Sequence, residues 1–120
     1  MQLGADIIEI ERIRNALMRH PAFDVRVLTA REMEYYREKT DPAPFLAGRF
    51  AAKEAILKCL GLGMRNLSWH DLEILPDELG APQVEFSQAV EKCMREKGIS
   101  AIKISISHSR DYAMAVAIGE

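Results

Sequence analysis

The chain has 120 residues, 48% of them hydrophobic and 7% aromatic, and its net charge is −2 at pH 7. This length and composition are typical of a single globular domain, residues 1–120. No run of residues approaches the roughly 20 apolar positions of a membrane span. The N-terminal residues include carboxylates where a cleavable leader has an apolar run, so we expect a cytoplasmic protein.

The first third of the chain reads as a strand followed by helices. The isoleucine-rich stretch at residues 2–11 predicts a strand that runs into a helix near Arg12. The HPAF segment at residues 20–23 predicts the end of that helix. Thr29 and Glu32 have the spacing of a capping box, which predicts the start of the next helix.

The rest of the chain mixes helices and strands. A breaker at residues 40–44 precedes a long predicted helix that ends at residues 61–63, and a second helix is expected between Ser87 and Gly98. Four stretches have the character of strands and pair in sequence order as two hairpins: 72–76, 83–86, 101–107 and 112–118. Because there is no regular βαβ order, the predicted class is α+β with a largely antiparallel sheet.

Two compositional features need an interpretation. Cys59 and Cys93 lack the spacing of a zinc site, so we expect reduced, packed cysteines. Between Arg12 and Arg31, five arginines stand against one acid, Asp24, which gives this block a charge of +4 and leaves −6 for the rest. Such a block can attract an acidic partner, or it can be a solvated helix face.

The long helix carries four charged residues although apolar or small residues occur on every side of it. These charges are Arg49, Lys53, Glu54 and Lys58. A helix that is apolar all round is expected to be buried, and buried charges need partners. A Glu54–Lys58 pair contributes only about 0.2–0.5 kcal/mol on an exposed helix. The charges therefore either form an ion-pair network within the chain or face a ligand.

A second unusual charge lies in the first strand. Alternation along the strand places Asp6 in one row with Gly4 and Ile8, so a carboxylate stands among apolar neighbours. A single buried acid is commonly structural, but Asp6 and Glu54 together suggest a site for a hard cation. Mg²⁺ typically takes one or two carboxylates and completes its coordination with water and phosphate oxygens.

Phosphate would supply partners for the cations of the long helix. Arg49, Lys53 and Lys58 are then expected to face phosphate oxygens, because arginine binds them bidentately and lysine acts as a point charge. Gly61 and Gly63 leave space for a close approach of a nucleotide, although a glycine at this position is also a common helix end.

His108 follows an apolar row along its strand and reaches the next turn. Ser107, Ser109 and Arg110 flank it, and this group could bind a terminal phosphate or be an ordinary polar turn. A hydrolase with a Ser–His pair is disfavoured, because adjacent residues on a strand point to opposite faces.

Three segments together resemble a known family: GADIIEIERI at residues 4–13, FLAGRFAAKEAILKCLG at 45–61 and ISISHSRDYAMAVAI at 104–118. They are similar to the holo-[acyl-carrier-protein] synthases, the group I 4'-phosphopantetheinyl transferases, over essentially the whole chain. The resemblance implies this family's α+β fold, with a long buried central helix and a homotrimer whose active sites lie at the subunit interfaces.

The same resemblance implies an activity. The chain is expected to transfer the 4'-phosphopantetheine group from coenzyme A to a serine of apo acyl carrier protein. Mg²⁺ would be required, adenosine 3',5'-bisphosphate would be released, and the reaction would support fatty acid biosynthesis. The serine proton is expected to pass to Glu54 or to a metal-bound water. Neither nucleic acid nor membrane is an expected partner. One alternative is a non-enzymatic module that binds a nucleotide or coenzyme A, and another is an RNA-binding protein that uses the arginine block.

The resemblance also assigns roles by position. Asp6 and Glu54 match the metal ligands, and with Lys58 they form the expected catalytic group. The positions expected to bind coenzyme A are Arg49, Lys58, Gly61, Gly63, His108 and Ser109. Arg12 matches a position that receives the acidic carrier protein, and Arg14, from the same arginine block, is expected to bind this partner as well. Residues 64–71 depart from the family pattern and are assigned no ligand contact.

Overall fold

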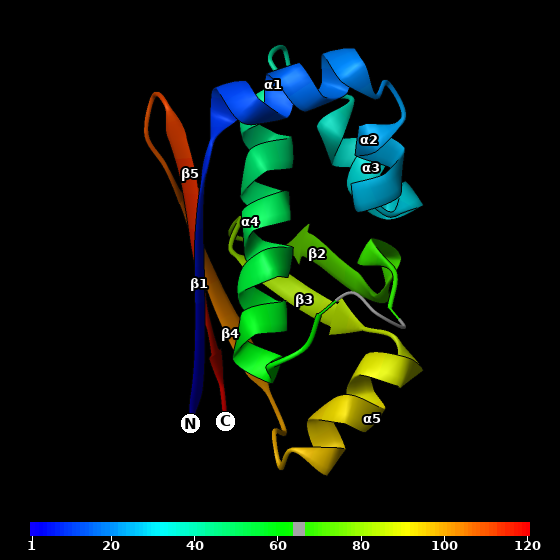
Figure 1. The fold of residues 1–120 in the computed structure, drawn as a ribbon, viewed down its shortest axis with the longest axis vertical. Helices are drawn as coiled ribbons and strands as arrows, with labels where there is room; N and C mark the ends of the chain where they lie inside the picture. The colour runs from blue at the N-terminus through cyan, green and yellow to red at the C-terminus, as the bar shows by residue number, and fades with distance from the viewer. Residues whose placement is uncertain (64–66) are drawn as a thin grey trace.

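The computed structural model describes residues 1–63 and 67–120 (Figure 1). Five helices, one 3-10 turn and five strands follow one another within these residues. They are β1 (Gln2–Glu9), α1 (Ile10–Arg19), α2 (Phe23–Val27), α3 (Ala30–Tyr36), α4 (Ala43–Leu60), η1 (Trp69–Asp71), β2 (Leu72–Pro76), β3 (Pro82–Phe86), α5 (Gln88–Glu96), β4 (Ile102–His108) and β5 (Tyr112–Gly119). The α+β class and the two antiparallel hairpins are therefore confirmed.

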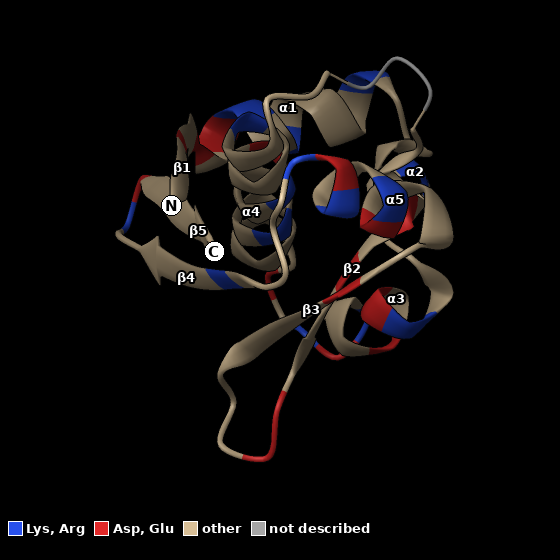
Figure 2. Ribbon diagram, turned by 90° about the horizontal axis from the view of Figure 1, so that it is seen from below, with Lys and Arg blue, Asp and Glu red and all other residues tan. Residues whose placement is uncertain are grey.

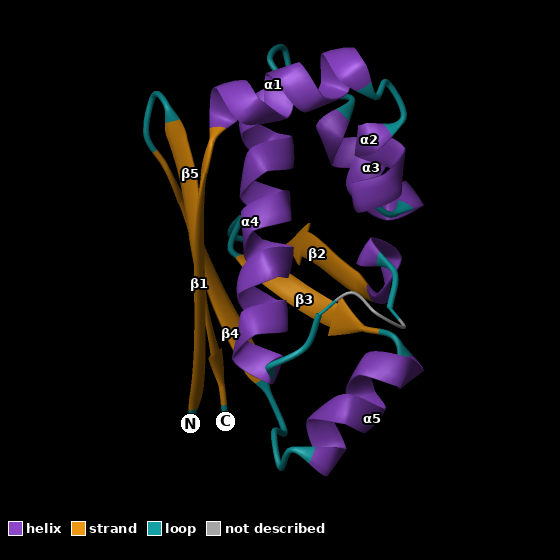
Figure 3. Ribbon diagram, in the orientation of Figure 1, coloured by secondary structure: helices purple, strands orange, loops and turns teal. Residues whose placement is uncertain are grey.

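The larger sheet has the strand order β1-β5-β4, and both strand pairs are antiparallel. Helix α4 runs along one face of this sheet, chiefly against β1 and β5, and strand β3 lies against β4 (Figures 1 and 3). The inward residues of β5 are small and buried, namely Ala113, Ala115 and Ala117. Because α4 also presents alanines, helix and sheet can pack closely.

Gly4 marks the closest approach between β1 and α4. A Cβ atom at this position would overlap the carbonyl oxygen of Ala55 and lie 2.6 Å from the backbone nitrogen of Cys59. Only glycine therefore lets β1 lie directly on the helix. This contact places Asp6, two residues later on the same face of β1, beside the C-terminal half of α4.

The second sheet is the hairpin of β2 and β3, which lies on the other side of α4 (Figure 3). Its turn projects from the molecule and carries acidic residues (Figure 2). The strand after this turn starts at Pro82, one residue earlier than predicted. The short helix α2 was not predicted, because five residues are too few to show a helical period.

The predicted helix ends agree with the capping geometry. Thr29 and Glu32 form the capping box of α3, and Ser87 accepts a hydrogen bond from the backbone N–H of Val90 at the start of α5. Gly61 ends α4 with a φ of 68°, a left-handed conformation that favours glycine. No helix in the described part of the chain combines the length and the apolar character needed to cross a membrane.

Candidate functional site

Lys53 does not face a ligand, so this prediction is wrong. Its side chain is fully buried, and Nζ donates to Glu32 Oε1 at 2.7 Å, to the carbonyl of Val27 at 2.6 Å and to the carbonyl of Trp69 at 3.1 Å. An ammonium group has three N–H donors, and all three are used. Burial lowers the pKa of Lys53, and the charge of Glu32 opposes this shift.

Glu32 is equally well satisfied. Its Oε1 accepts hydrogen bonds from Lys53 and from the backbone N–H of Thr29, and its Oε2 accepts one from the backbone N–H of Ile74 at 2.8 Å. The pair therefore links α2, α3, η1 and β2 to the middle of α4. For Lys53, the ion-pair network within the chain is the correct interpretation.

Lys58 contacts Asp6 instead of Glu54. Its Nζ lies 3.0 Å from Asp6 Oδ1 and 3.0 Å from the carbonyl oxygen of Ala5. These two bonds leave one N–H of the ammonium group for another acceptor. The side chain of Lys58 is 53% exposed and that of Asp6 17%, so this pair is accessible from solvent.

Glu54 lies close enough to Asp6 for their charges to interact. Its pKa is raised, first because the carboxyl group is partly buried and second because Asp6 is negatively charged, while Lys58 opposes the shift. Two neighbouring carboxylates with one lysine are short of positive charge. They could hold a divalent cation, and two carboxylates are enough for Mg²⁺ when phosphate and water complete its coordination.

The described residues contain no cluster of three or more His, Cys, Asp or Glu side chains that could hold a metal. This part of the protein therefore offers no complete metal cage. The pair of Asp6 and Glu54 fits a cation that a bound phosphate ligand also coordinates.

His108 packs against the first turns of α4. Its Nε2 lies 3.0 Å from the carbonyl oxygen of Pro44, and a Cβ atom at position 48 would come within 2.7 Å of the same nitrogen. Glycine at position 48 thus makes room for the imidazole ring. Ser109 supports the β4–β5 turn, because its Oγ accepts a hydrogen bond from the backbone N–H of Tyr112 at 3.0 Å.

Arg49 lies on the same half of α4. Its guanidinium carbon is 4.4 Å from the ring centroid of Phe45, a cation–π geometry. Burial lowers the pKa of Arg49, and Glu32 opposes this shift. Its buried Nε has no hydrogen-bond acceptor among the described residues. A buried donor of this kind is suited to a ligand or a water molecule.

The predicted site residues therefore form two separate groups. Arg49 and Lys58 are nine residues apart on α4, which corresponds to about 13 Å along the helix axis. Arg49 and Glu54 differ by about 140° around the same axis. Within one chain, the first group, Arg49 and His108, lies beside the first half of α4. The second group, Asp6, Glu54 and Lys58, lies beside its second half.

The end of α4 borders a hollow of about 300 Å³. It is lined by Gln2, Lys58, Cys59, Leu60, Gly61 and Lys97. Gly61 has a left-handed backbone because it ends the helix. Gly63 borders open space, since nothing lies within 4 Å of a Cβ atom built on it. Of residues 64–71, for which no ligand contact was predicted, residues 64–66 lie outside the described residues.

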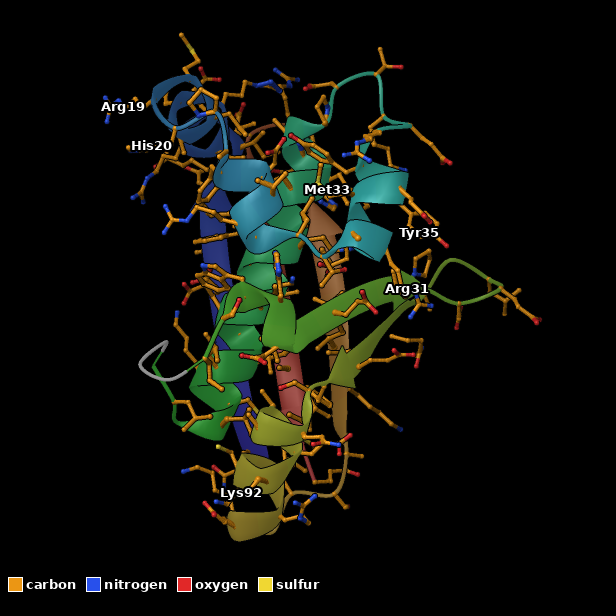
Figure 4. The ribbon with its side chains drawn as sticks, turned by 90° about the vertical axis from the view of Figure 1, so that its right-hand side faces the viewer. Arg19, His20, Arg31, Met33, Tyr35 and Lys92 are labelled. Carbon is orange, nitrogen blue, oxygen red and sulfur yellow. The ribbon has the colours of Figure 1, made fainter. Side chains whose placement is uncertain are left out.

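The arginine block is only partly available to a partner. Arg14 binds Asp41 at 2.7 Å and approaches Glu11 at 3.6 Å, and Arg31 binds Glu73 at 3.1 Å. Figure 4 shows Arg31 beside the β2–β3 hairpin, far from Arg19 at the end of α1. Arg12 is exposed, and no carboxylate in residues 1–63 or 67–120 lies within ion-pair distance of it.

Sequence reasoning missed two contributions. Glu32 was assigned only to a capping box, and nothing local in the sequence signals its bond to Lys53, which is 21 residues away. Lys97 lines the hollow beside Lys58, although it lies at the end of another helix. Both arise from tertiary packing, which a periodic pattern does not reveal.

The comparisons with known proteins agree with this geometry. The family model of the 4'-phosphopantetheinyl transferase superfamily matches residues 2–117. A holo-[acyl-carrier-protein] synthase from Caldanaerobacter subterraneus subsp. tengcongensis is 48% identical over 97% of this chain and 91% of its own length.

Two solved structures are also similar. The holo-[acyl-carrier-protein] synthase of Neisseria meningitidis is 35% identical and has a TM-score of 0.91 over 99% of this chain and 97% of that one. That of Helicobacter pylori, solved in complex with coenzyme A, is 32% identical and has a TM-score of 0.85 over 98% and 99%. The chain is therefore an enzyme that belongs to the holo-[acyl-carrier-protein] synthase family of 4'-phosphopantetheinyl transferases.

Proposed function

We propose that the protein transfers 4'-phosphopantetheine from coenzyme A to a serine of apo acyl carrier protein, in a reaction that requires Mg²⁺ and releases adenosine 3',5'-bisphosphate. The chain would thereby activate carrier protein for fatty acid biosynthesis in the cytoplasm. The observation that supports this most directly is the group of Asp6, Glu54 and Lys58, which has a shortage of positive charge and an unused N–H donor.

Asp6 and Glu54 would hold Mg²⁺, which when bound would neutralise charge on the pyrophosphate oxygens of coenzyme A. The serine oxygen of the carrier attacks the β-phosphorus and forms a new P–O bond. The bond from this phosphorus to the nucleotide 5'-phosphate breaks, and the nucleotide leaves with the bonding electrons. Positioning and charge neutralisation are the main contributions that a protein makes to such a transfer.

Lys58 would donate its remaining N–H to a phosphate oxygen. The contacts with Asp6 and Ala5 hold its ammonium group in place before the substrate arrives, so little reorganisation is needed.

Glu54 is our candidate for the residue that takes the serine proton. Burial and the charge of Asp6 raise the pKa of Glu54 in the metal-free protein. Bound Mg²⁺ would oppose this shift, so a metal-bound water is the alternative proton acceptor.

A homotrimer with active sites between subunits would explain the two separate groups of residues. The outer face of the larger sheet exposes a row of large apolar side chains, among them Leu3 (68% exposed) and Ile7 (64%), with Met114, Val116 and Ile118 beside them. A contiguous apolar face of this kind is typical of a protein–protein interface. If copies pack through this face, His108 and Arg49 of one copy would complete a site with Asp6 and Glu54 of the next copy.

Mixed subunits test this arrangement. Asp6→Asn and His108→Ala should each impair transfer when present in every subunit. Two differently tagged variants, co-expressed and purified through both tags, should recover activity in the sites that combine an intact Asp6 from one copy with an intact His108 from another. If both groups serve within a single copy, the mixed assembly would stay as impaired as its components.

The overall activity is tested by intact-mass measurement. Apo acyl carrier protein is incubated with the protein, coenzyme A and Mg²⁺, and the expected result is the mass increase of one phosphopantetheine group at serine. Chelation of Mg²⁺ should abolish the increase. Binding of coenzyme A without transfer and without a metal requirement would instead support the non-enzymatic binding module.

A further inference from the structure

The hollow at the end of α4 is positively charged. Lys58 and Lys97 are the two positively charged side chains that line it, and no carboxylate lines it. It adjoins the acid pair, because the Nζ of Lys58 is bound to Asp6 while the same residue forms part of the wall. A phosphate-bearing molecule that reaches Lys58 therefore has an open, positively charged space beside the reacting centre.

Lys97 is directed towards this space from a different helix. It is the C-terminal cap residue of α5, and its Nζ lies 3.7 Å from the position of a Cβ atom built on Gly61. The ammonium group therefore lies beside the end of α4, at an ordinary van der Waals distance from this position. In the part of the chain that the structure describes, no carboxylate lies within 4 Å of this nitrogen.

A purely structural role for Lys97 would be to bind the last carbonyls of α4. The carbonyl of Lys58 already accepts a hydrogen bond from the N–H of Gly61 at 3.1 Å, and the carbonyl of Leu57 accepts one from the N–H of Leu62 at 2.9 Å. No hydrogen bond joins Lys97 Nζ to either carbonyl. These two carbonyls are satisfied by the backbone itself, and the ammonium group of Lys97 stays available.

We propose that Lys97 is a further substrate-binding residue, which together with Lys58 binds a phosphate group of the donor in the hollow beyond Gly61. This proposal rests on the proposed function, in which coenzyme A is the donor. Coenzyme A carries two kinds of phosphate, the pyrophosphate and the 3'-phosphate, and a lysine point charge serves either.

The experiment compares Lys97→Gln with a matched control, Lys92→Gln, on the same helix. Lys92 is exposed as well, but it does not line the hollow. It lies on α5 and is labelled in Figure 4. Lys97→Gln should raise the KM for coenzyme A about tenfold, which corresponds to about 1.4 kcal/mol, a usual size for a charge-assisted hydrogen bond. The kcat and the KM for the carrier should change less than twofold. Lys97→Arg should restore the KM, and Lys92→Gln should match the wild type.

Dephospho-coenzyme A, which lacks the 3'-phosphate, identifies the bound group. If Lys97 binds the 3'-phosphate, Lys97→Gln and the wild type will have equal KM values for this analogue. If it binds the pyrophosphate, the tenfold difference will remain. If the wild type is active and Lys97→Gln has an unchanged KM for coenzyme A, the proposal for Lys97 is wrong and the proposed function stands.

Calorimetry separates this failure from that of the proposed function. If the wild type transfers no phosphopantetheine, the proposed function fails, and the Kd for coenzyme A then decides on Lys97. A weaker Kd in Lys97→Gln than in the wild type and in Lys92→Gln would still assign the phosphate contact. Equal Kd values in all three proteins would reject it.

Discussion

Two lysines on α4, five residues apart, form ion pairs of opposite character. Lys53 and Glu32 are both fully buried and lie 2.7 Å apart, and every donor of the ammonium group is used. Lys58 and Asp6 lie 3.0 Å apart and are partly exposed, and one donor remains unused. The difference lies in their surroundings, because each pair joins a lysine to a carboxylate.

This contrast separates a structural pair from a functional one. A buried charge is tolerated when its hydrogen-bonding capacity is met within the fold, as it is for Lys53. The charges around Lys58 are not balanced, since Glu54 and Asp6 repel each other and burial disfavours the charged form of Glu54. A ligand that brings a cation and phosphate groups would balance them, so the incomplete pair is the one suited to substrate.

The largest effect on stability is expected for Lys53→Met. The variant leaves the carboxylate of Glu32 buried without its cation, and loss of one partner of a buried pair costs about 3–5 kcal/mol of unfolding free energy. Urea denaturation followed by circular dichroism measures this loss. Lys58→Met should lower the unfolding free energy by less than about 1 kcal/mol, because its pair is partly exposed.

A double variant controls for lost packing. Glu32→Gln removes the buried negative charge and keeps an oxygen that can accept from Thr29 or Ile74. Lys53→Met combined with Glu32→Gln should therefore destabilise by less than the sum of the two single variants. If Lys53→Met cost no more than Lys58→Met, the distinction between the two pairs would be wrong.

The next effect is on catalysis, and it concerns Glu54→Gln. The variant removes one proposed metal ligand and the proposed proton acceptor, so we expect kcat to fall by a factor of about 10²–10³ at saturating Mg²⁺. Single-turnover transfer to carrier protein, followed by intact mass, measures the loss. A variant with a near-normal rate at saturating Mg²⁺ would show that Glu54 has neither role.

Although Glu54→Gln should lower kcat, it should not lower the unfolding free energy. Because the folded-state pKa of Glu54 is raised, the folded protein binds its proton more tightly than the unfolded chain, and its stability falls as pH rises through the raised pKa. Glutamine carries no charge to bury. The variant should therefore be at least as stable as the wild type at pH 7.5, and its relative advantage should shrink as the pH falls towards the ordinary glutamate range.

The sequence predicted those features that depend on local patterns. The capping box at Thr29 and Glu32, the glycine end of α4 and the two hairpins all follow from short motifs, and each is present. It also placed Asp6 on the inner face of β1. The pairing of charges could not be predicted in the same way, because it depends on distances between segments that are far apart in the chain.

Lys58 illustrates this limit. Helical spacing favours a pair with Glu54, four residues earlier, yet the ammonium group binds Asp6, which is 52 residues away. Gly4 lets β1 approach α4 so closely that the carboxylate of Asp6 and the carbonyl of Ala5 are nearer partners. Lys53 shows the reverse error, since a cation that seemed available to phosphate is fully bound within the fold.

The smallest effect is expected on carrier binding, where the same contrast between used and available charges applies to arginines. Arg12 has no ion-pair partner in residues 1–63 and 67–120, whereas Arg31 binds Glu73 and lies 3.6 Å from Glu85. Arg12→Glu should raise the KM for acyl carrier protein about five- to tenfold at low salt, because charge reversal weakens the attraction of an acidic partner. The KM for coenzyme A should stay nearly unchanged.

Ionic strength provides the discriminating measurement. Screening reduces attraction between exposed charges, so the difference between Arg12→Glu and the wild type should shrink as salt rises from 0.01 M to 0.15 M. Arg31→Gln is the matched control, because its guanidinium is already held by the β2–β3 hairpin and should contribute little to docking. Equal effects of Arg12→Glu on both substrates, or an equal effect of Arg31→Gln on the carrier, would show that an available charge on α1 does not define the docking surface.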